Sequence, residues 1–407
     1  MDWAPYLPLI SALVALLLGL AIGKAWERYK LRDGRWIDRR RARESQHYVL
    51  GLNFLVSNQI DLAIEELSRA ARVDTDALEI HLILGNVYRE RGQVSRAIQV
   101  HQALLQRPKL TRLEHSYVLL CLGLDYKRGG FVDRALEAFK EVLRLSPENQ
   151  YALLYLEKLY EEQHQWDEAY RIRRQLVELS GPDTQPRNQA ILGFLENALG
   201  IDALKAQHRD EAVRHFESAI GLDSATTPAY LNLGDVRLQA GDTAGAVAAW
   251  QQLMEVSPER AHLALERLER LYIQQGAPQR FEEQCRRFID GRPQDWRARL
   301  ALGVHLSRSG RAAQAFDLLI EALEQNPHGL TVHQAVWTVL VQLDLDRALV
   351  HEYIEAARGA VFFLDPHVCL KCHYRSTELL WQCPHCHEWN SFVEERIAAA
   401  RQTSSEM

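Results

Sequence analysis

The sequence predicts an all-α protein: a superhelical solenoid of helical hairpins, with an N-terminal transmembrane helix and a small C-terminal metal-binding ribbon. Three observations support this prediction. A degenerate repeat of about 34 residues runs from Glu44 to Gly329. An aliphatic stretch precedes the repeats, and two Cys-x-x-Cys motifs follow them.

The repeat has the layout of two short helices. Its clearest copy carries Leu119, Leu122, Gly123 and Tyr126, and a second apolar series follows. Apolar residues three and four apart place one stripe on each helix. One hairpin cannot bury both of its faces, so neighbouring copies must stack into a solenoid with a concave surface. Seven of the eight copies have alanine near the start of the second helix: Ala63, Ala97, Ala135, Ala169, Ala212, Ala246 and Ala315.

This layout resembles the tetratricopeptide repeat, whose period is about 34 residues. Solenoids of this kind bind other proteins on their concave surface and seldom carry out chemistry. The array is predicted to span residues 44–360 and to end in an atypical helical pair, over 331–343 and 346–358, that caps the solenoid. Two prolines and a glycine at 180–186 interrupt the array, and we expect them to divide it into two blocks of four copies.

Carboxylates in the array invite an enzymatic interpretation, but their position favours a structural one. Four aspartates lie two residues before the small residue of the second helix, where a short acidic side chain caps free N–H groups and complements the helix dipole. These residues are Asp61, Asp133, Asp167 and Asp210. Scattered histidines such as His101 and His305 show no ligand spacing and are interpreted as surface or packing residues. No enzymatic activity is predicted.

Residues 1–23 are predicted to be a retained transmembrane anchor. Between Trp3 and Gly23 no side chain other than Tyr6 is ionisable. About 20 apolar residues cross a hydrocarbon core of roughly 30 Å. A cleaved signal peptide is the alternative, but it requires positive charge before the apolar core. Here the only early charge is Asp2, and the positive charges follow the apolar stretch.

Residues 24–43 form a basic juxtamembrane linker with nine lysines and arginines against three acidic residues. Lysine and arginine are retained on the cytoplasmic side of a membrane, so the body of the protein is expected in the cytoplasm. Contact of this linker with anionic lipid headgroups is expected. The whole chain has a net charge of −6, which gives no indication of a nucleic-acid partner.

A metal site is predicted between residues 361 and 394, followed by a tail at 395–407. The proposed ligands are the four cysteines of two Cys-x-x-Cys motifs separated by ten residues: Cys369, Cys372, Cys383 and Cys386. Each short turn aims two sulfurs at a common point, so four thiolates can surround one ion. The spacing suits Zn²⁺ and iron alike. Such a small module cannot build an adequate core, so metal binding is expected to fold it.

The module resembles a rubredoxin-like zinc ribbon. Residues 374–382 suit a strand pair, and Trp389 and Phe392 suit a closing strand. Rubredoxins usually place glycine after each Cys-x-x-Cys motif, whereas this chain has His373 and His387 there. This difference argues against a redox rubredoxin.

Together, the anchor, basic linker, repeat array and ribbon resemble the lipopolysaccharide assembly protein B family of gram-negative bacteria. The ribbon residues that carry the resemblance most specifically are Cys369, Cys372, Trp381, Cys383, Pro384, Cys386 and Trp389. Membership implies a non-enzymatic inner-membrane adaptor that promotes degradation of the deacetylase LpxC by the membrane protease FtsH. It also implies a link to a membrane regulator that senses lipopolysaccharide supply, and to other lipopolysaccharide assembly factors.

Two other functions fit the residues. One is a general scaffold for envelope assembly without a role in proteolysis, and the other is a membrane-tethered electron carrier with iron in the ribbon. The sequence does not fix the oligomeric state, and a homodimer is compatible with it. A nucleic-acid partner is not expected, because charges within the ribbon cancel and nucleic-acid binding needs a basic face.

Overall fold

The structure of the chain is a computed structural model, which describes residues 45–108, 110–181, 184–357 and 367–394. Four predicted segments lie outside these residues: 1–23, 24–43, 361–364 and 395–407. In the part of the chain that is described, no helix combines the length and the apolar composition needed to span a bilayer.

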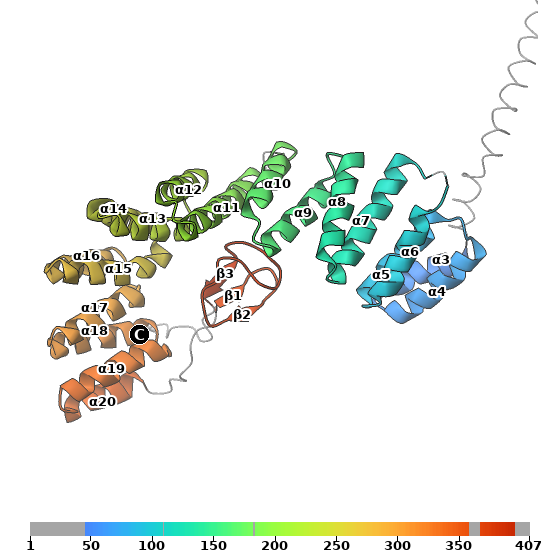
Figure 1. Ribbon diagram of the computed structural model, residues 1–407. Coiled ribbons are helices and arrows are strands. Elements are labelled where there is room, and N and C mark those ends of the chain that lie inside the picture. The colour runs from blue at the N-terminus through green and yellow to red at the C-terminus, as the bar shows by residue number, and fades with distance from the viewer. Residues whose placement is uncertain (1–44, 109, 182–183, 358–366, 395–407) are drawn as a thin grey trace, which may run out of the picture. The chain divides into compact units, whose positions relative to one another are not determined.

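The structure consists of two compact units that meet in the sequence between Gln163 and His164. The first unit is drawn in blue to green in Figure 1 and contains stacked helical hairpins. Its described helices are α3 (Gln46–Val56), α4 (Ile60–Val73), α5 (Leu78–Glu90), α6 (Val94–Leu105), α7 (Arg112–Arg128), α8 (Val132–Leu145) and α9 (Gln150–Glu162).

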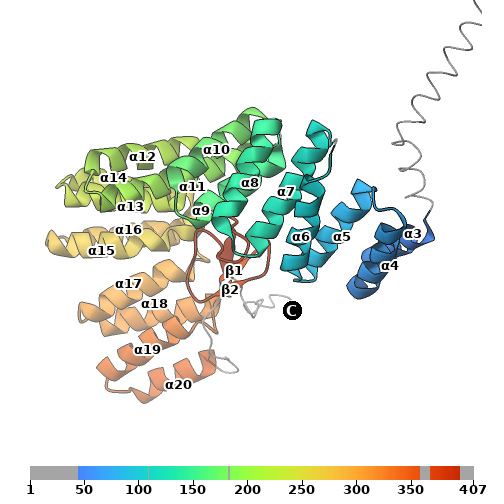
Figure 2. The same cartoon turned by 45° about the vertical axis from the view of Figure 1, so that its right-hand side comes forward.

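The second unit holds the rest of the array and the ribbon (Figures 1 and 2). Its helices are α10 (Trp166–Glu178), α11 (Gln185–Lys205), α12 (Arg209–Leu222), α13 (Thr227–Gln239), α14 (Thr243–Val256), the 3₁₀ helix η3 (Pro258–Arg260), α15 (His262–Gln274), α16 (Pro278–Gly291), α17 (Trp296–Arg308), α18 (Ala312–Gln325), α19 (Leu330–Gln342) and α20 (Arg347–Ala356). Its strands are β1 (His367–Cys369), β2 (Arg375–Ser376) and β3 (Phe392–Glu394). The solenoid fold is confirmed: every predicted copy is a pair of helices, and α19 and α20 form the predicted terminal pair.

The two units divide within the fourth repeat, not at residues 180–186 as the sequence predicts. Helix α10 packs against α11 across the interruption, and the Arg173 guanidinium donates a hydrogen bond to Asn188 Oδ1 at 3.1 Å. Pro186 lies in the first turn of α11. Proline at this position starts a helix because the first N–H groups have no helical acceptor. The interruption is therefore a turn within one unit.

Close packing between the two helices of each hairpin sets the core. The seven repeat alanines are fully buried. Large residues of the second helix lie against glycines of the first, as Phe216 does against Gly200. A Cβ atom placed on Gly200 would lie 2.5 Å from Phe216 Cε1, which is closer than real Cβ contacts. Glycine at this position therefore allows the close approach of α11 and α12.

The four aspartates do not cap their helices as predicted. Asp61, Asp133, Asp167 and Asp210 each occupy the second position of the helix, and none of these helices has a side-chain cap bond. At the second position a carboxylate still complements the dipole of the first turn. Asp61 also forms an ion pair with Arg91 of the next hairpin, at 2.8 Å.

Two histidines predicted as packing or surface residues are buried in ion-pair networks. His101 Nδ1 lies 2.5 Å from Asp125 Oδ2, and Arg89 donates to the other oxygen of the same carboxylate at 2.9 Å. His305 Nδ1 lies 2.9 Å from Glu269 Oε1. Such networks connect neighbouring hairpins, because a buried carboxylate needs partners that supply charge and hydrogen bonds.

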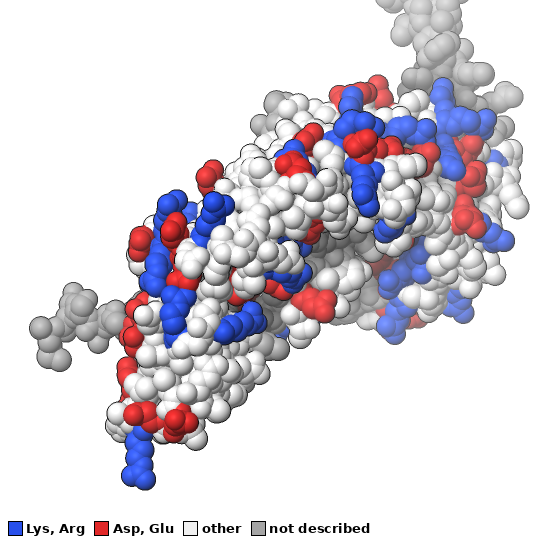
Figure 3. Space-filling model, turned by 60° about the vertical axis from the view of Figure 1, so that its left-hand side comes forward, with Lys and Arg blue, Asp and Glu red and all other residues white. Residues whose placement is uncertain are grey.

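Charged side chains of both signs intermix on the face drawn in Figure 3, where lysines and arginines lie among aspartates and glutamates. A nucleic-acid interface would need basic residues gathered on one side. The described residues on this face have no such continuous basic field.

A pair of glycine substitutions in the fifth repeat tests the packing account. Gly200→Ala should lower the free energy of unfolding of the second unit by about 1–3 kcal/mol, because the new methyl group overpacks Phe216. Gly221→Ala in α12 is the matched control, since nothing lies within 4 Å of a Cβ there. It should stabilise by roughly 0.5–1 kcal/mol. Urea unfolding measures both, and equal effects of the two substitutions would contradict the account.

Candidate metal centre and the adjoining groove

The ribbon contains a small three-stranded antiparallel sheet with the strand order β2-β1-β3, and three of the four cysteines lie in the segments that connect its strands. Cys369 ends β1 and pairs with Phe392 of β3, which is the predicted closing strand. The sequence predicts a strand pair over residues 374–382, but within it only the two residues of β2 form a strand. The rest of this segment turns back, because the second Cys-x-x-Cys motif must return to the first.

The four thiols converge on one point. Cys369 Sγ lies 3.6 Å from Cys386 Sγ, and Cys372 Sγ lies 3.6 Å from Cys383 Sγ. All four sulfurs are within 4.8 Å of one another. A disulfide would need about 2.05 Å. Four sulfurs bound tetrahedrally to zinc at about 2.3 Å lie about 3.8 Å apart, so the donor set and its spacing suit one metal ion.

The residue after each Cys-x-x-Cys motif has a left-handed backbone, with φ of 58° at His373 and 54° at His387. The N–H of each donates to the carbonyl of the first cysteine of its motif, at 2.9 Å. Glycine adopts this conformation without steric cost, whereas other residues lose roughly 1 kcal/mol. These two turns thus have the backbone that favours glycine, but this chain has histidine there.

The surroundings of Cys369 and Cys386 shift the pKa values of these two thiols in opposite directions. Burial acts to raise the pKa of Cys369, but the hydrogen bonds from Ser391 and from backbone N–H groups outweigh it and lower the pKa to about 6. Burial raises the pKa of Cys386 to about 12, and the neighbouring thiols add to this effect. Four thiolates so close together repel one another unless a cation neutralises them. Metal binding would therefore replace protons in this cluster.

Two tryptophans of the ribbon pack against the helices of the second unit. The Trp389 ring stacks on Phe194 of α11, with 5.4 Å between ring centroids, and meets Trp166 of α10 at 6.1 Å. The Trp381 ring lies 6.5 Å from Phe194. Phe194 is fully buried. Aromatic pairs of this kind contribute about 0.5–1.5 kcal/mol each beyond the area that they bury.

Polar contacts surround this aromatic centre. Arg187 of α11 forms an ion pair with Glu388 at 2.8 Å, and Lys371 reaches the same carboxylate. Burial acts to raise the pKa of Glu388, but these two cations outweigh it and lower the pKa. Arg297 of α17 forms an ion pair with Glu394 of β3. The ribbon is therefore attached to helices that are far apart in the sequence.

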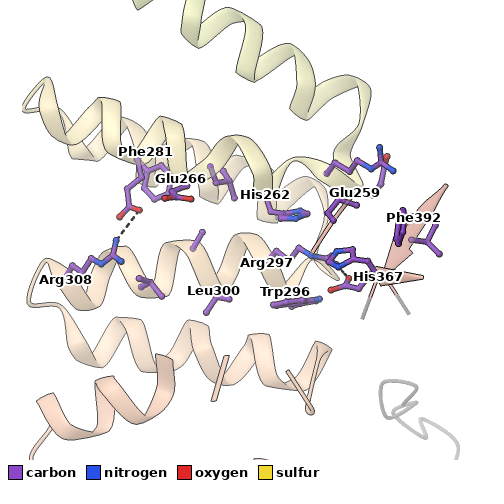
Figure 4. A pocket seen from close by; sticks show the side chains of 18 residues that line it. Glu259, His262, Glu266, Phe281, Trp296, Arg297, Leu300, Arg308, His367 and Phe392 are labelled. Atoms are coloured by element: carbon purple, nitrogen blue, oxygen red, sulfur yellow. Dashed lines mark hydrogen bonds and ion pairs between the residues drawn. The ribbon is translucent and has the colours of Figure 1, made fainter. Parts of the chain in front are cut away.

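A groove of about 760 Å³ lies beside the ribbon, between α15 and α17 (Figure 4). On α17 its lining residues recur every three or four positions, as Arg297, Leu300, Val304 and Arg308 do, so they share one face of the helix. Trp296 and Ala301 of α17 also line it. The remaining lining comes from η3, α15, α16 and the ribbon: Glu259, Arg260, His262, Leu265, Glu266, Glu269, Phe281, His367, Leu379, Phe392, Val393 and Glu394. The repeats and the ribbon build this groove together.

Basic side chains gather where the groove meets the ribbon. Burial lowers the pKa of His262 to about 4, and the positive charge of Arg297 adds to this effect. Its imidazole is therefore neutral near pH 7. Burial also lowers the pKa of Arg260, although this guanidinium stays protonated. Arg260 Nη1 donates to Asn390 Oδ1 at 2.7 Å, and its guanidinium lies 5.3 Å from the Trp381 ring centroid.

The structure brings together all four predicted cysteines, and it adds residues that the sequence did not single out. Phe194, Arg260, His262 and Arg297 form the contact with the ribbon or the groove, yet each lies in an ordinary helical segment. The one available signal was Pro258, which starts η3 and sets Arg260 between two helices. Without the position of the ribbon, this proline indicates only a turn.

Fold and site define the chain as a tetratricopeptide-repeat protein that carries a rubredoxin-type ribbon. A family model described as tetratricopeptide repeat matches residues 48–109, 121–172 and 197–255. A second family model, described as rubredoxin metal binding domain, matches residues 367–394 and so includes all four cysteines.

Relatives extend the similarity over most of the chain. Lipopolysaccharide assembly protein B of Escherichia coli strain K12 is 28% identical over 354 residues, which are 86% of this chain and 89% of that protein. The Haemophilus influenzae protein of the same name is 24% identical over 398 residues, covering 93% and 97%. A crystal structure of a tetratricopeptide repeat protein from Parabacteroides merdae is 16% identical and covers 72% of this chain and 98% of its own, with a TM-score of 0.35. The relatives and the two family models together support the lipopolysaccharide assembly protein B family, with its tetratricopeptide repeats and metal ribbon.

Replacing one thiol tests the four-cysteine site. Cys383→Ser should lose the metal and loosen the ribbon, because a serine hydroxyl is a much poorer ligand than a thiolate for the ion in such a site. Metal content per chain, measured by mass spectrometry, is expected to fall well below one. Cys121→Ser in α7 removes a thiol of the other unit and should leave metal content unchanged. Full metal content in Cys383→Ser would refute the assignment.

Acid should weaken the second unit through His262. Its pKa is about 4 in the folded protein and 6.5 for an unperturbed histidine, so the unfolded chain binds the proton more readily. The free energy of unfolding should therefore fall as pH drops from 6.5 towards 4, by at most about 3 kcal/mol. Because metal loss also depends on pH, the quantity to measure is the difference between wild type and His262→Gln. Identical pH profiles for the two proteins would contradict this role.

Proposed function

We propose that this protein is a non-enzymatic adaptor of the bacterial inner membrane that regulates lipopolysaccharide synthesis by binding other proteins. Its partners would include the protease FtsH and the deacetylase LpxC, whose degradation the adaptor would promote. The name of its relatives, lipopolysaccharide assembly protein B, supports the link to lipopolysaccharide. A membrane regulator that senses lipopolysaccharide supply and other assembly factors would be further partners, and homodimerisation is compatible with the proposal.

The groove between α15 and α17 is the observation that carries this proposal. It lies on one face of α17, it has an apolar floor with charged ends, and the ribbon borders it. Mostly apolar clefts with a few convergent polar groups are typical binding sites. In a stacked-hairpin protein such a face is suited to hold a polypeptide segment.

The anchor would restrict this groove to the plane of the membrane. In the proposal residues 1–23 span the inner membrane, residues 24–43 contact anionic headgroups, and the array at 44–360 and the ribbon at 361–394 lie on the cytoplasmic side. Restricting an adaptor to the plane where a membrane protease resides raises the effective concentration of a captured substrate. A substrate bound by the adaptor would thus be brought to the protease.

The metal would have a structural role. We propose that Cys369, Cys372, Cys383 and Cys386 hold one zinc or iron ion, which would cross-link the two Cys-x-x-Cys turns. Within the ribbon the buried apolar cluster comprises little more than Phe392 and the cysteines, with two leucines packed against it. A core of this size gains its stability mainly from metal binding.

An iron-loaded electron carrier is the second candidate function, because sulfurs 3.6 Å apart suit iron as well as zinc. The left-handed histidines that follow both motifs depart from the glycine pattern of rubredoxins. A coloured protein with a reversible redox titration would favour the carrier. A colourless protein with one zinc per chain would exclude it. A general envelope scaffold would bind partners without changing LpxC turnover.

Deleting the anchor tests the adaptor proposal. In cells with this chain as their only copy, removal of residues 1–23 should slow LpxC turnover and raise its level several-fold, because tethering is lost. The matched control replaces residues 1–23 with an unrelated single-spanning helix of the same orientation, which should restore turnover. Pulse-chase labelling of LpxC measures both, and normal turnover without any anchor would count against tethering.

A further inference from the structure

Arg260 has unused capacity to bind an anion. Its guanidinium lines the groove and has five N–H donors, yet among the described residues it makes one hydrogen bond, to Asn390, and packs on the face of Trp381. In the described part of the chain no carboxylate lies within ion-pair distance of this guanidinium. The negative charge of Glu259 acts to raise the pKa of Arg260, but the two side chains form no ion pair. A partly buried guanidinium is suited to bind a carboxylate through two parallel hydrogen bonds.

The groove ends at the ribbon, near Arg260. Figure 4 shows His367 and Phe392 at one end of the cavity and Arg308 and Phe281 at the other, with α15 and α17 along its sides. Phe392 is almost fully buried in the ribbon, and the ion pair of Arg297 with Glu394 fixes the ribbon to α17. An extended chain that runs towards the ribbon would have to stop there, so this end is suited to a chain terminus.

The middle of the groove is aliphatic. Leu265 of α15 and Leu300, Ala301 and Val304 of α17 line it. From residue 297 to residue 308 the helix rises by about 16 Å. That length accommodates about five residues of extended polypeptide at roughly 3.3 Å each. The walls therefore suit a short run of small or branched aliphatic side chains.

The far end has acidic groups. Glu266 is exposed, and Glu269 is shared between His305 at 2.9 Å and Arg308 at 3.5 Å. Glu266 forms an ion pair with Arg270, and both of these side chains are largely exposed. An exposed pair of this kind is held by less than about 1 kcal/mol, so Glu266 can readily exchange Arg270 for a ligand cation. This end is suited to a lysine or arginine, whereas the ribbon end is suited to a carboxylate.

We propose that the groove binds the carboxyl-terminal four or five residues of a partner polypeptide, with the free carboxylate on Arg260 and aliphatic side chains between α15 and α17. A basic residue just upstream would face Glu266. This inference rests on the proposed adaptor function, and it specifies how a partner is recognised. An anchored terminus would leave the rest of the partner free to reach a protease.

A peptide series tests this proposal without any change to the protein. The probes are fluorescein-labelled heptapeptides of the form Gly-Ser-Lys-x-x-x-x, whose last four positions vary over Ala, Val, Leu and Ile. Each is made with a free carboxylate and as the amide. Fluorescence anisotropy with the zinc-loaded full chain in detergent should show free acids binding at least tenfold more tightly than their amides. If no acid binds more tightly than its amide, the proposal is wrong.

Two arginine substitutions locate the effect. Arg260→Gln should remove the difference between acid and amide, and Arg260→Lys should keep part of it, because a lysine retains charge but not the planar fork. Arg308→Gln, at the other end of the groove, is the matched control and should retain the full difference. Zinc content and near-ultraviolet circular dichroism verify that the ribbon stays folded. Discrimination unchanged in a folded Arg260→Gln protein would overturn the assignment.

The two proposals fail in distinguishable ways. If LpxC turnover depends on the anchor but free-acid and amide peptides bind equally, the adaptor function is supported and recognition of a terminal carboxylate is refuted. If free-acid peptides bind more tightly than their amides but LpxC turnover does not depend on this protein, the groove recognises chain ends in another pathway. Equal, appreciable binding of acid and amide would indicate that the groove holds internal segments of a polypeptide.

Discussion

The contact between the ribbon tryptophans and the inner side of the second unit is the interaction on which the rest of the structure depends. Trp389 and Trp381 pack on Phe194, and the Arg260 guanidinium lies over the Trp381 ring. The ion pairs around them are partly exposed and contribute about 0–1 kcal/mol each. The aromatic contacts therefore determine where the ribbon is placed. A loosely folded ribbon could not present both rings together, so their geometry depends on the four-thiol centre.

This arrangement gives the metal centre a role in shaping a protein surface. The ribbon borders the groove through His367, Phe392 and Glu394, while α15 and α17 supply its long walls. Neither the repeats nor the ribbon alone would enclose that space. Solenoids usually offer an open concave face. Here a small module with four converging thiols closes one end of the groove, so that the open face becomes a binding site of defined direction and limited length.

The sequence predicted the fold well where a local rule determines it. Repeat spacing located the hairpins from α3 to α18, and two Cys-x-x-Cys motifs located four converging sulfurs. It failed where a long-range contact decides the outcome. The division of the array falls at Gln163, because α10 packs with α11 and meets the ribbon through Trp166. Arg260 and Phe194 carry no local signal, since their partners lie about 120 to 200 residues away in the sequence.

The central claim is that the metal-folded ribbon forms one wall of the groove and holds its helices in place. Hydrogen exchange of the full chain, with zinc bound and after its removal by chelation, tests this claim most directly. The account predicts that removal speeds exchange at least tenfold in the ribbon and also in η3 and the first turns of α11, α15 and α17, while α3 to α8 are unaffected. Loss of protection confined to the ribbon, with these helices unchanged, would contradict it.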